Sequence, residues 1–333
     1  MFEIPFNPRE QRLTTTAKTA LITRVAELYY ERELSQKDIA DMLELSRPMV
    51  SRLLAEAKES GVVTISINRP LEKREDLAKQ VLNRFELKEV IVVPGGDPDT
   101  SRKNVGVATA ELLTTILRND DIIGVSWGRD LYHTISSLAK LELENIQVAQ
   151  LAGGLGEGDA ASDGPEIARL LGEKLSAQVR YLYAPTVVQT ADTKKQLIEQ
   201  AQLAQTITLA SQIDVALTGI GAIDDLSSSL GKAGYISEKD RKALKKQEGK
   251  AHLLGYMLDA KGKTLKHNYN DRVVAAPLKY LKRAKWSIGI ASGVQKADAV
   301  LAALQGGYFN TLVLSEDVAT QILEAQNQKI LST

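Results

Sequence analysis

The chain has 333 residues, and its 42 Lys and Arg side chains are balanced by 42 Asp and Glu, which gives a formal net charge of zero. This length predicts about two domains, and the neutral balance excludes a polybasic protein, so any binding of nucleic acid must rest on a local patch. The chain contains no cysteine, which excludes disulfides, thiol nucleophiles and cysteine-ligated metal sites.

The remaining composition predicts a cytoplasmic protein without a metal or cofactor. The three histidines, His133, His252 and His267, are scattered without the spacing of metal ligands. No apolar run approaches the roughly 18 residues that a membrane span requires. The N-terminus, interrupted by Pro5 and Pro8, does not resemble a signal peptide.

The first sixty residues predict three short helices. Residues 16–31 carry apolar side chains at helical spacing, and residues 35–43 begin with Ser35 as a candidate N-cap. Residues 46–61 begin with Ser46, carry Pro48 in the first turn and end at Gly61. Two short helices joined by a tight turn are typical of a helix-turn-helix that binds DNA.

The third of these helices presents polar side chains on the face opposite its apolar stripe. Arginine can bind guanine through two hydrogen bonds, and serine can reach a phosphate or a base edge. A three-helix interaction module uses the same apolar spacing and stays open as an alternative. The residues expected to contact DNA are Ser35, Gln36, Ser46, Arg47, Pro48, Ser51 and Arg52.

A strand-like segment, 62–67, and an amphipathic helix within 70–87 follow. The apolar stripe of this helix, with Leu71, Leu77, Val81 and Phe85, can pack on its own domain or pair with another chain, and we favour pairing. The sequence thus divides into a DNA-binding domain (1–60), a linker strand with a candidate oligomerisation helix (61–87) and a ligand-binding domain (88–333).

From residue 89 onward, β-branched runs alternate with helical stretches. This alternation predicts an α/β domain with a mostly parallel, doubly wound sheet, in which ligands bind beyond the carboxyl ends of the strands. The predicted strands are 89–93, 121–126, 146–151, 179–184, 214–219, 252–258, 286–291 and 310–314.

The residues that follow these strands predict a site for a small anion. Ser126, Gly128 and Arg129 directly precede a helix, where free backbone N–H groups favour a phosphate. Lys296 stands at another helix N-terminus and offers a second cation. Each glycine loop alone is a weak signal, because βα turns use glycine for backbone geometry. The residues expected to bind the ligand are Ser126, Gly128, Arg129, Gly153, Gly154, Gly156, Gly219, Gly221, Asp259, Asp271 and Lys296.

Several motifs, in order and at consistent spacing from about residue 15 to the end, resemble the SorC family of bacterial transcription regulators. They include SQKDIADMLELSRPMVSRLLAEAKESGVV (35–63), DIIGVSWGRDLYHT (121–134), DVALTGIGAI (214–223) and KADAVLAALQGGYFNTLVLSE (296–316). Within this family the chain is most similar to the deoxyribonucleoside-responsive members.

The resemblance implies a winged-helix-like helix-turn-helix head and a Rossmann-like effector domain related to ribose-5-phosphate isomerase and glucosamine-6-phosphate deaminase. It implies a regulator of a carbohydrate or nucleoside catabolic operon, and we expect this regulator to be a repressor. The expected partners are palindromic operator DNA, a second copy of the chain in a dimer or tetramer, and a phosphorylated sugar such as deoxyribose 5-phosphate or another pentose or hexose phosphate.

The alternative is a sugar-phosphate isomerase-like enzyme with an accessory helical domain. Proton abstraction next to a carbonyl requires a base within hydrogen-bond reach. The strand at 214–219 leads into Gly219–Ala222, which supplies no base, and acids appear only at Asp224 and Asp225. The spacing of Gly124, Ser126 and Gly128 also fits the nucleophile elbow of hydrolases, but we favour binding over catalysis.

Overall fold

The computed structural model describes residues 15–63, 71–156, 160–223 and 229–331. The chain separates into two compact units, which we call the head (residues 1–70) and the body (residues 71–333). The division falls inside the segment 61–87 that the sequence assigned to a linker. Most of the predicted strand 62–67 lies outside the described residues.

The described part of the head folds into α1 (Thr15–Tyr30), α2 (Gln36–Met42) and α3 (Arg47–Glu59). Ser35 begins α2 as the sequence predicted, because its hydroxyl oxygen accepts the backbone N–H of Asp38 at 3.2 Å. Apolar side chains of all three helices form one buried core, which holds α3 in place. These side chains are Ile22, Val25, Ala26, Leu28, Ile39, Ala40, Val50, Leu53, Leu54 and Ala57.

A seven-stranded sheet organises the body, with the order β1-β10-β9-β5-β2-β3-β4. Every neighbouring pair is parallel, which confirms the predicted parallel sheet. In chain order the strands are β1 (Glu89–Val93), β2 (Ile122–Val125), β3 (Gln147–Gln150), β4 (Gln178–Arg180), β5 (Val215–Gly219), β9 (Trp286–Ala291) and β10 (Thr311–Ser315).

The strand order reverses direction between β2 and β5. From β2 the chain continues through β3 and β4 to one edge of the sheet, whereas β5, β9 and β10 extend it the opposite way toward β1. Such a reversal leaves a crevice at the carboxyl ends of the two strands.

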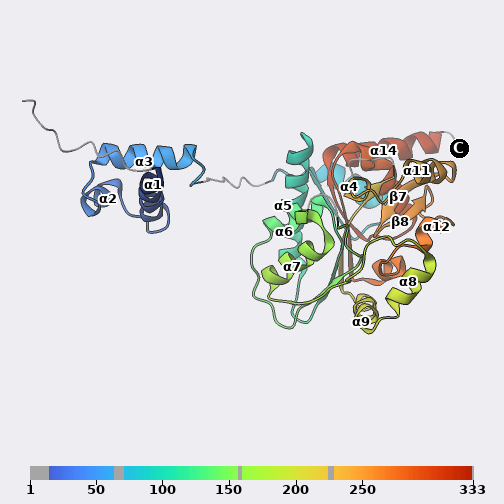
Figure 1. Cartoon of the computed structure of the whole chain (residues 1–333). Helices are drawn as coiled ribbons and strands as arrows, with labels where there is room; N and C mark the ends of the chain where they lie inside the picture. The colour runs from blue at the N-terminus through green and yellow to red at the C-terminus, as the bar shows by residue number, and fades with distance from the viewer. Residues whose placement is uncertain (1–14, 64–70, 157–159, 224–228, 332–333) are drawn as a thin grey trace, which may run out of the picture. The chain divides into compact units, whose positions relative to one another are not determined.

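Helices cover both faces of the sheet (Figure 1). On β1, Ile91 and Val93 face one core while Val90 and Val92 face the other, as expected for a strand buried on both sides. The first face carries α5 (Pro98–Ile116), α6 (Arg129–Ser137) and α7 (Gly164–Leu175). The second face carries α4 (Glu75–Phe85), α9 (Ala201–Ala210), α13 (Ala297–Gln305) and α14 (Glu316–Leu331).

The apolar stripe of α4 packs against its own unit. Val81 is fully buried, and Leu77 and Phe85 pack on the same core. Within this chain the stripe therefore packs on its own unit, the alternative that was not favoured, and pairing of α4 with another copy stays a prediction.

The segment 252–258 corrects a second expectation. The sequence predicted one strand there, but the structure contains β7 (Gly249–Leu253) and β8 (Tyr256–Asp259). In a separate antiparallel sheet, β7 pairs with β8 on one side and with β6 (Gly221–Ala222) on the other. Leu254 and Gly255 both have positive φ, at 51° and 88°, as a tight hairpin turn requires.

The remaining elements are short. Residues 191–210 form two consecutive helices, α8 (Ala191–Ile198) and α9. The others are α10 (Ser229–Lys232), α11 (Glu238–Lys246), α12 (Asn268–Asp271) and the 3-10 helices η1 (Ala160–Ser162), η2 (Leu278–Arg283) and η3 (Val294–Lys296). None of the helices in the described ranges is both long and apolar enough to cross a membrane.

Candidate functional site

A pocket of about 60 Å³ lies where β2, β5 and β9 end, at the reversal of the strand order. A single water requires roughly 10–15 Å³, so the pocket has room for a group the size of a phosphate. Its lining includes the predicted residues Ser126, Gly128, Arg129, Gly219, Gly221 and Lys296, together with Arg102, Trp127, Asp130, Leu131, Ile220, Ser229, His252, Leu254, Ser292 and Gln295.

The turn after β2 forms one wall of the pocket. Gly128 has φ 137°, a conformation that other residues rarely adopt, and it is the N-cap of α6. The backbone N–H of Gly128 donates to the carbonyl of Ser162 at 2.9 Å, which fixes the start of α6. Arg129 is the first helical residue, so the positive end of the helix dipole and a guanidinium lie at the same wall.

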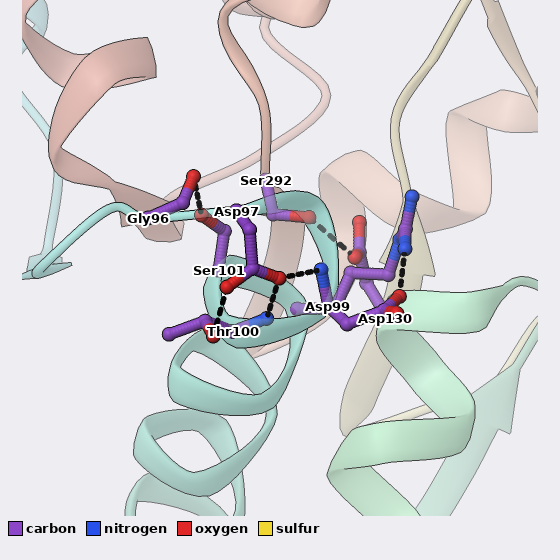
Figure 2. Close-up of polar contacts among 8 residues, drawn as sticks. Gly96, Asp97, Asp99, Thr100, Ser101, Asp130 and Ser292 are labelled. Atoms are coloured by element: carbon purple, nitrogen blue, oxygen red, sulfur yellow. Dashed lines mark hydrogen bonds and ion pairs between the residues drawn. The ribbon is translucent and has the colours of Figure 1, made fainter.

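Lys296 contributes to this pocket through a buried ion pair that the sequence did not predict. Its Nζ lies 2.6 Å from Oδ2 of Asp130, and Oδ1 of Asp130 accepts the hydroxyl of Ser292 at 2.6 Å (Figure 2 shows the serine contact). The Asp130 side chain is only 4% exposed and that of Lys296 17%. Burial raises the pKa of Asp130, but the charge of Lys296 and the hydrogen bonds outweigh it and hold that pKa below its usual value.

Arg102 is a further cation that sequence reasoning missed. It lies near the start of α5, which Asp97 caps by accepting the backbone N–H groups of Asp99 and Thr100 at 3.0 and 3.1 Å (Figure 2). The Arg102 side chain is 14% exposed, and its Nη1 lies 2.6 Å from Oδ1 of Asp99. Arg129 and Lys296 were found because each follows the end of a strand. No strand end immediately precedes Arg102, so this signal did not mark it.

Gly219, the last residue of β5, and Gly221, the first residue of β6, need to be glycine for different reasons. A Cβ built on Gly221 would lie 2.0 Å from Nε2 of His252, so the imidazole ring occupies the space of a side chain. A Cβ on Gly219 would meet only the carbonyl oxygen of Trp127, at 3.7 Å. Gly221 therefore serves packing, whereas Gly219 leaves open space on the wall of the pocket.

The predicted glycine loop 152–156 does not line this pocket. The N–H of Gly153 donates to Val274 and that of Gly154 to Ala184, and a Cβ on Gly153 would lie 2.5 Å from the Ala184 oxygen. These glycines allow two backbone segments to approach each other. Gly156 lines a separate hollow, and its N–H donates to Asp163 at 3.1 Å.

The two predicted carboxylates also lie outside the lining of the pocket. Both hydrogen bonds to Oδ1 of Asp259 come from the backbone N–H groups of Lys261 and Lys263, at 2.9 Å each, so this carboxylate holds the turn after β8. Asp271 is exposed at the end of α12. Each acid belongs to a different loop from those that converge at β2, β5 and β9, so the structure does not bring either of them to this pocket.

In the head, most of the predicted residues are exposed. Arg47, Ser51 and Arg52 are exposed on α3, as are Ser46 and Pro48 at its start, while Gln36 is partly buried. Ser35 is exposed, but its hydroxyl is engaged with the Asp38 carboxylate at 2.6 Å as well as with the cap. Two apolar side chains, Met42 and Met49, are 56% and 39% exposed beside them.

Comparisons with known proteins identify a family model and several regulators that this chain resembles. The family model described as a sugar-binding domain matches residues 69–324. The chain is 31% identical over 308 residues to the deoxyribonucleoside regulator of Bacillus subtilis (strain 168), covering 92% of this chain and 98% of that protein. It is 30% identical over 308 residues to the transcriptional regulator LsrR of Escherichia coli (strain K12), covering 91% and 94% of the two chains.

A solved structure gives the same result for the fold. The full-length sorbitol operon regulator SorC from Klebsiella pneumoniae superimposes with a TM-score of 0.69 at 26% sequence identity, covering 91% of this chain and 98% of that one. Each of these three relatives is named as a regulator and not as an enzyme.

Proposed function

The chain belongs to the SorC family of sugar-binding transcriptional regulators, and from this premise we propose that a phosphorylated sugar bound in the pocket controls the affinity of the head for operator DNA. The chain is a transcriptional regulator and not an enzyme. Asp130, the carboxylate among the described lining residues, already accepts two hydrogen bonds and is engaged in holding Lys296.

The observation that carries the proposal is the convergence of cations from separate βα units on one pocket. Arg129 comes from the turn after β2 and Lys296 from the turn after β9, and both line the same pocket at the reversal of the strand order. A phosphate ester carries about −1.5 to −2 charges at neutral pH, and charge-assisted hydrogen bonds stabilise it most strongly. Ser126, Gly128 and Gly219 supply a hydroxyl, a helix N-terminus and open space beside these cations.

The sugar that we propose first is 2-deoxyribose 5-phosphate. The support is the 31% identity to a protein named as a deoxyribonucleoside regulator, over nearly the full length of both chains. Other pentose and hexose phosphates are the competing ligands, since the relatives also include a sorbitol operon regulator.

For the head we propose that α2 and α3 act as a helix-turn-helix in a winged-helix-like domain, with α3 as the recognition helix. The exposure of Arg47, Ser51 and Arg52 supports this role. One such helix reads only a few base pairs, so two heads of a homo-dimer or tetramer bind the half-sites of a palindromic operator. In this proposal residues 1–60 form the DNA-binding domain and 88–333 the effector domain, which shares its ancestry with ribose-5-phosphate isomerase and glucosamine-6-phosphate deaminase.

The protein acts as a repressor in this proposal, and the effector changes its affinity for DNA. A ligand shifts the protein between two states only by its differential affinity for them, typically about 1–3 kcal/mol in allosteric proteins.

Thermal-shift titrations with 2-deoxyribose 5-phosphate, other sugar phosphates and the same sugars without phosphate test the proposal. A phosphorylated sugar should stabilise the protein by about 2.7 kcal/mol at a hundred times its Kd, with no product in a parallel turnover assay. Arg129→Ala should weaken this binding at least tenfold, while Arg169→Ala, on an exposed face of α7, should not change it. Equal binding of phosphorylated and unphosphorylated sugars would contradict a phosphate site.

A further inference from the structure

Two cations that line the pocket, Lys296 and Arg102, are each paired with an acid, and the two ion pairs differ in their exposure to water. In the first pair, Asp130 is buried and Lys296 is largely covered, with side chains 4% and 17% exposed. In the second pair, Arg102 is covered, at 14%, but its partner Asp99 is 89% exposed. The two pairs therefore respond differently to an anion that enters the pocket.

The first pair is held together. If Lys296 left Asp130, a buried carboxylate would remain without its counter-charge, which is among the most unfavourable changes in a protein interior. An entering phosphate can therefore use only those Nζ protons that Asp130 does not engage. The Ser292 hydroxyl, bound to the other oxygen of Asp130 at 2.6 Å, further fixes this geometry.

The second pair is exchangeable. Asp99 lies almost entirely in water, and exposed ion pairs contribute little to stability, so the carboxylate loses little when its partner turns elsewhere. The guanidinium of Arg102 has five N–H donors, of which one binds Asp99 at 2.6 Å. Arg102 also lies near enough to Asp130 to contribute to the low pKa of that carboxyl.

We propose that Arg102 is a third cation of the phosphate site and that Asp99 is an internal competitor for it. When phosphate binds, Arg102 exchanges the exposed Asp99 carboxylate for the phosphate, whereas Lys296 keeps Asp130. This inference rests on the proposed function of the pocket, and it adds α5 to the elements that contact the ligand.

The charges in the pocket support this exchange. Arg102, Arg129 and Lys296 are three cations among the described lining residues, and Asp130 is a permanent counter-charge to one of them. With Asp99 released to water, the charge of the Arg102 guanidinium becomes available to the ligand, which favours a phosphate dianion.

A double-mutant cycle on the full-length protein tests the exchange, with inorganic phosphate as the probe in isothermal titration at constant ionic strength. Arg102→Ala should weaken phosphate binding at least tenfold, since charge-assisted bonds are lost. Asp99→Asn should instead tighten it by about two- to fivefold, because the competing carboxylate contributes only as much as an exposed ion pair. In the Arg102→Ala background, Asp99→Asn should change nothing.

Two matched variants exclude a general effect of charge or helix stability. Asp76→Asn removes an exposed first-turn carboxylate from α4 and should leave phosphate affinity unchanged. Arg169→Ala removes an arginine that is paired with Glu166 and Glu173 on α7, and it should likewise have no effect.

The outcomes separate this inference from the function on which it rests. If Arg129→Ala weakens phosphate binding but Arg102→Ala and Asp99→Asn do not, the pocket binds phosphate and the exchange is wrong. If Asp99→Asn weakens binding to the same degree as Arg102→Ala, the pair acts as a structural unit and the competition is wrong. If the wild-type protein binds neither inorganic phosphate nor any sugar phosphate, both proposals fail together.

Discussion

The head and the body place their proposed functional side chains in opposite surroundings. In the head, Arg47, Ser51 and Arg52 project into solvent from a helix whose other face forms the core. In the body, Asp130 and Lys296 line the pocket and also form an ion pair between α6 and η3, in which Asp130 is buried. We therefore expect function and stability to be separable in the head and coupled in the body.

The largest expected effect is the loss of stability on Lys296→Ala. This change leaves Asp130 buried without its cation, which should cost about 3–5 kcal/mol in the free energy of unfolding at neutral pH. The double variant Asp130→Asn with Lys296→Met, which removes both charges, should recover most of that loss. Urea denaturation measures the stability of both variants. A Lys296→Ala protein as stable as the wild type would show that function and stability are not coupled in the body.

Lowering the pH should also weaken the contribution of the Asp130–Lys296 pair to stability. The folded-state pKa of Asp130 is below its usual value of 3.8, so its ionised form contributes stability above that pH and loses it as the pH falls through the folded-state pKa. Asp130→Asn should therefore flatten the fall of stability below about pH 3.8.

Substitutions at Gly219 and Gly221 should affect different properties of the body, ligand binding in the first case and stability in the second. Gly221→Ala places a methyl group against His252 and should destabilise by about 1–3 kcal/mol, as overpacking does. Gly219→Ala meets only the Trp127 oxygen, at 3.7 Å, so the protein should keep its denaturation midpoint and lose affinity for the sugar phosphate. Titration with the sugar phosphate measures the affinity of both variants, and urea denaturation measures their stability. A Gly219→Ala protein that loses stability but keeps its affinity would show that Gly219 is required for packing.

In the head, Arg47→Ala and Arg52→Ala should each weaken operator binding by about 1–3 kcal/mol, as the loss of a base contact does. Stability should change by less than about 0.5 kcal/mol, because both side chains are exposed. A gel-shift series on operator variants, beside a denaturation curve, checks both parts. Wild-type affinity in both variants would show that another face of the head binds DNA.

The smallest expected effect concerns His133 on α6. Burial lowers the pKa of His133 below its usual 6.5, although nearby Asp130 opposes this, so the folded state binds the proton less readily than the unfolded state. Stability should therefore decline as the pH falls below about 6.5, and less so in His133→Gln. Urea midpoints between pH 7 and 5 measure the difference, and parallel curves for the two proteins would exclude it.

The sequence was sufficient for features that follow from local pattern. The alternation of β-branched runs with helical stretches from residue 89 onward predicted a parallel sheet covered on both faces, and this was confirmed. Reading the residues after each strand brought Ser126, Arg129, Gly219 and Lys296 together, because parallel strands end at one edge.

The remaining features depend on contacts between distant segments. An acid in the first turn of a helix commonly faces water and complements the dipole, so nothing in the sequence marked Asp130 as buried. Gly153 and Gly154 looked like a ligand loop, but the need for glycine comes from the backbone of residues 184–185. Leu254 and Gly255 looked like the middle of one strand, since an apolar run does not reveal a hairpin turn within it.

The shape of the sheet edge limits how copies of this chain can associate. The edge strand β4 spans only Gln178–Arg180, and its two end residues are exposed and polar, one of them charged. Short, charged edges discourage the strand-to-strand pairing through which sheets aggregate or swap segments. At the β4 edge, copies should therefore associate through side-chain surfaces and not by extending the sheet of one copy into that of the next.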